Sequence, residues 1–162
     1  MQNKININIA VDVAKALSEK TLLNNVYMMD NSACGSKNQG TEQLCTFCIP
    51  GQTIRWIVYA IDLQTPVAIK DIAFIASDRQ IKPAQMKENS DSNTVLPEDN
   101  PDLKIWTGIV PYMLLGHTYQ YRLTLQMGNG FNSVMSLNGP ALLYCGCATA
   151  YKKQTTTKIE QL

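Results

Sequence analysis

The chain has 162 residues, and its 14 Lys and Arg nearly balance its 13 Asp and Glu, which leaves a net charge of +1. This balance argues against a nucleic-acid-binding protein, for which a basic stripe would be expected, and the length suits one domain with a proper core. A low net charge also means little repulsion between copies of the chain, which favours self-association near neutral pH.

The N-terminal part predicts a strand, a helix and a second strand. Apolar residues alternate with more polar ones from Ile5 to Val11, which is typical of a strand with one buried face. Asp12 is a candidate N-cap for a short helix near residues 13–20. Residues 26–29 predict the next strand, and the small polar residues from 32 to 42 predict a surface loop.

The stretch from Pro50 to Asp62 has the strongest strand pattern in the chain. Apolar residues fill both of its faces at period two, so this strand should be covered on both faces or lie centrally. A strand at 44–49 precedes it, and a second β-rich run follows at 67–76. We predict that the strands at 50–62 and 67–76 form the centre of the domain.

The second half of the chain supplies the remaining strands. Residues 77–102 are polar and predict a long functional or extended loop. A strand follows at 103–110, and residues 119–127 alternate most cleanly. The pair Asn129-Gly130 predicts a tight hairpin, and two last strands are expected at 134–137 and 142–148. Residues 155–162 are expected to form a tail.

These elements together predict the fold class. About eight short strands, one short helix and no alternation of strands with helices indicate an all-β, single-domain β-sandwich over residues 1–154. The pattern does not distinguish a jelly roll from a Greek key.

Cysteine content and apolar stretches predict the compartment. No stretch approaches the ~18 apolar residues of a membrane span, and the N-terminus lacks the apolar region of a signal peptide. We therefore expect a cytoplasmic protein that contacts no membrane. An odd number of cysteines fits reduced thiols better than a secreted disulfide framework, the five being Cys34, Cys45, Cys48, Cys145 and Cys147.

Two close cysteine pairs, Cys45 with Cys48 and Cys145 with Cys147, could in principle supply four thiolates to zinc. Residues three apart on a strand point to opposite faces, so Cys45 and Cys48 are not expected to bind one ion. Buried cysteine that packs as a small apolar residue is the expected role. We predict no metal and no cofactor.

The single histidine, His117, limits the catalytic options. A blue-copper site needs two histidines and is excluded. A hydrolytic triad would have to use His117, and no Gly-x-Ser-x-Gly elbow accompanies it. The acidic residues near 98–102 lie in a polar loop, where solvation is expected rather than acid–base catalysis. The protein is therefore not expected to be an enzyme, and a small hydrolase is the weakest alternative.

Aromatic side chains are the remaining candidates for a ligand site. Tryptophans at inward strand positions are expected to pack in the core. The alternative is a carbohydrate- or small-ligand-binding, lectin-like module, in which ring faces with a polar rim would hold the ligand, with the 77–102 loop beside them. Its candidate binding residues are Trp106, Tyr112, Tyr119 and Tyr121.

A resemblance to a known family rests on four stretches that are spread over most of the chain. They are Ile5–Val13, Asn25–Asn31, Pro50–Trp56 and Trp106–Val110. Together they resemble the PixA/AidA type of bacterial inclusion-body protein. The resemblance implies a β-sandwich with no established catalysis, and it supplies no catalytic residues. It also implies an abundant cytoplasmic protein of a kind that can accumulate as crystalline inclusions.

The residues and the resemblance lead to one functional expectation. We expect a non-enzymatic, self-associating cytoplasmic β-sandwich protein that packs into inclusions at high concentration. Its expected partner is a second copy of the chain, in a two-fold dimer that pairs edge strands or sandwich faces.

Overall fold

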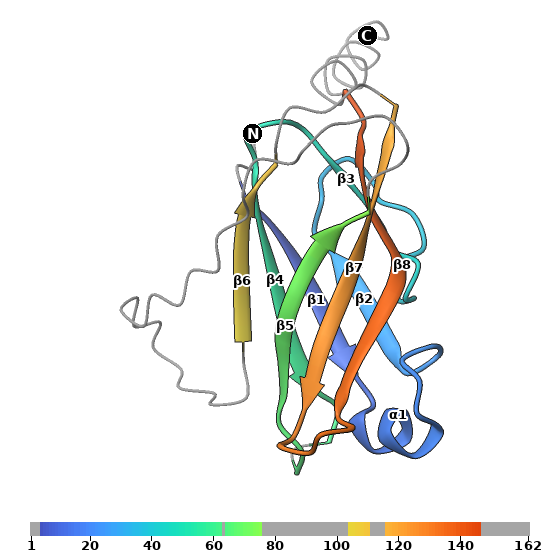
Figure 1. Cartoon of the computed structure of the whole chain (residues 1–162). Helices are drawn as coiled ribbons and strands as arrows, with labels where there is room; N and C mark the ends of the chain where they lie inside the picture. The colour runs from blue at the N-terminus through green and yellow to red at the C-terminus, as the bar shows by residue number, and fades with distance from the viewer. Residues whose placement is uncertain (1–3, 63, 76–103, 111–115, 147–162) are drawn as a thin grey trace, which may run out of the picture.

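Two four-stranded sheets pack face to face in the computed structural model, which describes residues 4–62, 64–75, 104–110 and 116–146 (Figure 1). Sheet A has the order β2 (Val26–Asp30), β1 (Lys4–Val11), β4 (Thr53–Ala60) and β6 (Lys104–Ile109). Sheet B has the order β3 (Cys45–Cys48), β8 (Val134–Tyr144), β7 (Thr118–Met127) and β5 (Val67–Phe74). The predicted all-β sandwich is confirmed.

Both sheets are mixed. β1 pairs in parallel with β4, β3 pairs in parallel with β8, and the other neighbours are antiparallel. β4 lies between β1 and β6, in agreement with its apolar faces. The prediction that the next strand shares the centre with β4 is wrong, because β5 is an edge strand of the other sheet. The connection after β4 crosses from sheet A to sheet B. The inward face of each of the two strands, β4 and β5, therefore packs toward the opposite sheet.

The one helix of the described residues, α1 (Val13–Glu19), closes the end of the sandwich near the β7–β8 connection (Figure 1). The Asp12 side chain accepts a hydrogen bond from the Lys15 N–H at 3.1 Å, which confirms its role as the N-cap. Val13 and Ala16 are buried, and Lys20 ends the helix in the left-handed conformation. No helix of the described part is long and apolar enough to cross a membrane.

Alternation along each strand places the core between the sheets. Trp56 on β4 and Tyr121 on β7 are its largest fully buried side chains. They are surrounded by the inward-facing aliphatic residues of β1, β4 and β7, and burial of each such side chain contributes about 1.5–3 kcal/mol.

The two strands predicted at 134–137 and 142–148 form one continuous strand, β8, as far as the described residues extend. Asn138, Gly139 and Pro140 lie between the two predicted segments. In the structure Gly139 and Pro140 lie opposite the single residue Tyr121, between the pairs Arg122–Asn138 and Gln120–Ala141. This β-bulge lets a proline sit in an interior strand, because a bulged position needs no ladder hydrogen bond.

The predicted hairpin joins β7 to β8, but its connection is wider than an Asn-Gly pair alone requires. Met127 N–H donates to the Ser133 carbonyl at 2.8 Å, so Gly128 to Asn132 lie in the turn. Gly128 has a φ of 69° and donates its N–H to the Pro66 carbonyl at 2.8 Å. This bond fixes the turn to the β4–β5 connection.

Candidate interaction surface

The four predicted ligand-binding residues are not brought together on an open surface. Tyr121 is fully buried in the core, so its ring offers no face at the surface. Tyr119 and Trp106 are half-buried and pack against the core from different sheets. Tyr112 lies outside the described residues.

Tyr121 instead connects the two sheets. The Trp56 Nε1–H donates to Tyr121 Oη at 3.1 Å, and the two rings meet edge to face with centroids 5.9 Å apart. Burial raises the pKa of the Tyr121 hydroxyl well above its ordinary value, so it stays protonated. The pair satisfies a buried indole donor and fixes the register of one sheet over the other.

Of the four cysteines in the described part of the chain, one is disulfide-bonded and three are thiols. Cys34 is disulfide-bonded, so the prediction of a reduced thiol is wrong there, whereas Cys45, Cys48 and Cys145 carry reduced thiols. An odd cysteine count gives no information on which positions the fold brings together. Cys147 lies outside the described residues.

The thiols on β3 occupy different environments. Cys45 is half-buried and Cys48 is fully buried, as the alternation of β3 requires for opposite faces. Burial raises the pKa of the Cys48 thiol from 9.0 to about 12. His117 lies exposed at the start of β7. Within the described ranges, no three His, Cys, Asp or Glu side chains are grouped so as to hold a metal ion.

The outer face of sheet A is apolar over the half nearer α1. The strand register places its outward side chains in rows across the sheet, and two adjacent rows are almost free of polar groups. Tyr27 and Met29 on the edge strand β2 are 39% and 47% exposed. We call this surface the apolar patch; it consists of Ala10, Tyr27, Met29, Ile57, Tyr59 and Ile105, with Asn8 between Met29 and Ile57.

The outer face of sheet B has the opposite character. β7 alternates buried apolar residues with outward polar ones, and β8 continues the polar rows through Ser136 and Asn138. Arg122 Nε–H donates to Asn138 Oδ1 at 2.9 Å, and the Thr124 and Ser136 hydroxyls are 2.9 Å apart. Sheet B therefore presents a face suited to water, whereas sheet A does not.

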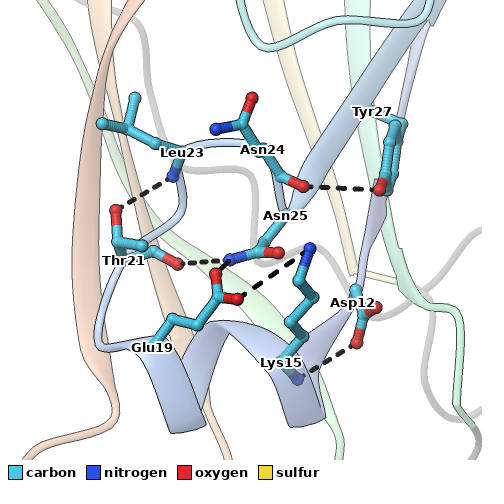
Figure 2. A network of polar contacts seen from close by, with 8 residues as sticks. All are labelled: Asp12, Lys15, Glu19, Thr21, Leu23, Asn24, Asn25 and Tyr27. Carbon is cyan, nitrogen blue, oxygen red and sulfur yellow. Dashed lines mark hydrogen bonds and ion pairs between the residues drawn. The ribbon is translucent and has the colours of Figure 1, made fainter.

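A network of hydrogen bonds lies in the turn between α1 and β2, beside the end of the apolar patch that is nearest α1 (Figure 2). Asn25 is fully buried, and its amide donates to Glu19 Oε2 at 2.9 Å and to the Thr21 carbonyl at 3.1 Å. The Tyr27 hydroxyl donates to the Asn24 carbonyl at 3.4 Å. These bonds hold the turn that leads from α1 into β2, and with it the position of Tyr27.

One loop covers the free edges of two strands, one in each sheet. On β2, the Met28 carbonyl accepts from Gly40 N–H at 2.7 Å, and Asp30 N–H donates to Gln39 Oε1 at 2.9 Å. On β3, Cys45 exchanges two backbone hydrogen bonds of 3.0 Å with Lys37. We call this segment, residues 32–44, the edge loop.

The opposite flank of the sandwich is protected differently. β5 carries a bulge between Ile69 and Asp71, where Lys70 is the extra residue. Both Lys70 and Asp71 are exposed, and charges combined with a bulge disfavour pairing with another strand. β6 lies between two segments outside the described residues.

A groove of about 760 Å³ lies between α1 and the β7–β8 hairpin. Its walls are Leu17, Met127 and Met135, and the fully exposed Phe131 stands at its rim. Of the residues predicted to bind a ligand, the three that the structure describes, Trp106, Tyr119 and Tyr121, do not line it.

A family model described as "Domain of unknown function (DUF8788)" matches residues 3–132. The chain belongs to the DUF8788 family. The match ends before β8, although β8 is an interior strand of sheet B, so the described fold of this DUF8788 domain extends beyond the matched region.

Among solved structures, the DUF8788 domain is similar to the inclusion body protein PixA from Burkholderia cenocepacia J2315. The two share 9% sequence identity with a TM-score of 0.53, over 87% of this chain and 91% of that chain. The search among curated proteins found no match. At this identity the similarity concerns the fold, and it confirms the resemblance to PixA-type proteins at that level.

Sequence reasoning missed the apolar patch of this DUF8788 domain. Ile57 and Tyr59 were visible as the second apolar face of β4, but the face was expected to be covered within the domain. Tyr27 and Met29 alternate with buried residues on β2 and carried a comparable signal. Only the strand order brings these residues into neighbouring rows.

Proposed function

We propose that this protein is a non-enzymatic, self-associating β-sandwich that acts as a homodimer or higher assembly in the cytoplasm. The apolar patch is the observation that carries the proposal. An outward sheet face with exposed tyrosine and methionine and half-buried isoleucine is unfavourable in water, and such patches mark interaction surfaces. A net charge of +1 adds little repulsion when two copies approach.

Two further observations support the proposal. The structurally similar PixA protein is described as an inclusion body protein, and self-association of this chain would agree with a protein of that kind. The most buried thiol, Cys48, is kept protonated by its raised pKa, unlike the activated thiolate of a cysteine enzyme.

Sedimentation equilibrium of the full chain tests the proposal. We expect a mass above that of the 18.0 kDa monomer at micromolar concentration, rising over a tenfold concentration range. A single species of 18.0 kDa throughout that range would refute self-association.

A further inference from the structure

We propose that the apolar patch on the outer face of sheet A is the contact between copies, packed against the same patch of a second copy about a two-fold axis. This inference rests on the proposed function and specifies its surface, since self-association alone is compatible with contacts between edges, between faces or between hairpins.

The edges at β2, β3 and β5 do not offer the contact. The edge loop already hydrogen-bonds the outer sides of β2 and β3, through Gly40 and Gln39 on β2 and Lys37 on β3. The bulge and exposed charges of β5 block its edge as well. A second copy that added a strand at β2 or β3 would have to displace hydrogen bonds that the chain makes with itself.

The outer face of sheet B is also a poor contact surface. Its polar rows bond laterally to one another, as Arg122 does to Asn138 and Thr124 to Ser136. Burying these groups against a second copy would remove them from water without providing new partners.

The absence of charged side chains makes the apolar patch suitable for contact with the same patch of a second copy. A two-fold contact brings like residues near one another, so a charged residue at its centre would face its own copy. The patch contains no charged residue, and Arg55 lies in the next row. Its one strongly polar side chain, Asn8, carries both donors and an acceptor and can pair with the Asn8 amide of the second copy.

The size of the face fits a reversible dimer. Four strands spaced ~4.8 Å apart and about 25 Å long give an outer face of about 500 Å², of which the two rows of the apolar patch make up about half. A contact that covers the whole face of both copies, with the row of Arg55 at its rim, buries about 1,000 Å², which lies at the lower limit of specific interfaces. Sheets packed this way lie ~10 Å apart, so a dimer would stack four sheets.

The test replaces outward residues with lysine in the full chain and measures the dissociation constant by sedimentation equilibrium. Ile57→Lys changes the centre of the patch, and Met29→Lys changes a patch residue that is 47% exposed on the edge strand β2. Thr124→Lys is the matched control, because it changes an outward residue of an interior strand in sheet B. We expect both patch variants to weaken association about tenfold or more, and the control to change it less than about threefold.

The outcomes separate the inference from the proposed function. If the wild-type chain associates and Met29→Lys associates equally well, the apolar patch is not the contact, although self-association stands. If the wild-type chain is monomeric and Met29→Lys lowers its melting temperature, a segment of the same chain covers the patch, and both proposals are refuted. Circular dichroism shows whether Ile57→Lys still folds. If it does not fold, the dissociation constant of Met29→Lys alone shows whether the apolar patch is the contact.

Discussion

At the scale of single residues, the pair Trp56–Tyr121 does most to define the core. It links the sheets through one hydrogen bond and one edge-to-face ring contact, and both residues are completely buried. Substitutions of Trp56 and of Tyr121 are therefore both expected to lower the free energy of unfolding, by different amounts.

Trp56→Ala is expected to lower the free energy of unfolding by about 3–5 kcal/mol, because it leaves a large cavity between the sheets. Tyr121→Phe keeps the ring but leaves the indole N–H without its acceptor, which costs about 1–3 kcal/mol. Urea titration measures both. Tyr59→Phe, on the outer face of β4, is the control and should stay within about 0.5 kcal/mol. A loss under about 1 kcal/mol for Trp56→Ala would show that the core does not depend on this side chain.

The residue scale also shows what the sequence could predict. Alternation correctly placed Trp56 inside, and the same alternation along β7 put Tyr121 with Leu123 and Leu125 on the inward face. Grouping Tyr121 with surface aromatics disregarded that pattern. The Cys34 disulfide was not predictable, because it depends on which distant segments the fold brings together.

At the scale of elements, the bulge in β8 is the feature that sequence patterns misassigned. Gly139 has a φ of 152°, which L-residues rarely adopt, and a Cβ there would lie 2.6 Å from Gln43 Nε2. Asn-Gly-Pro therefore does not end the strand. It shifts the register by one residue, so that Leu137 and Leu142 both face the core.

Gly139→Ala is expected to destabilise the fold by about 1–3 kcal/mol through backbone strain. The Gln43 side chain can move, so Gly139→Ala in a Gln43→Ala background tests the steric part separately. Denaturant titration of the single and double variants should leave most of the loss in place when Gln43 is absent. Stability equal to that of the wild-type chain in Gly139→Ala would contradict the strained conformation.

Strand existence was more predictable than strand partnership. Each strand has its own local apolar pattern, so segments of all eight were predicted from the sequence, β8 as two strands rather than one. Partnership depends on which faces need cover, and the parallel pairs β1–β4 and β3–β8 join segments far apart in the chain. For this reason the apolar patch, which spans four strands, could not be assembled from the sequence.

At the scale of the whole molecule, the two outer faces differ in polarity, and this difference determines how association should respond to solution conditions. The apolar patch contains no charged side chain, so its contact depends on the burial of apolar area rather than on ion pairs.

The dissociation constant is therefore expected to change by less than about threefold between about 0.05 and 0.5 M NaCl, because screening acts mainly on exposed charges. Sodium sulfate at the same ionic strength should strengthen association, since sulfate favours apolar burial. Sedimentation velocity in both salts gives the comparison. Association weakened about tenfold by NaCl would indicate that charged groups such as Arg55 carry the contact.

The parallel pairing of β3 with β8 also affects the order in which the molecule can form. β3 aligns Cys45 with Ala141, so its ladder has no partner until nearly the whole described chain has been synthesised. While the C-terminal part is still inside the ribosome, sheet B lacks an interior strand, and the inner face of sheet A remains partly uncovered. Such incomplete chains expose apolar surface and unpaired strands to one another. Sheet B of this protein can thus be completed only after translation has passed β8, and before that point the nascent chain is most exposed to contacts with other incomplete chains.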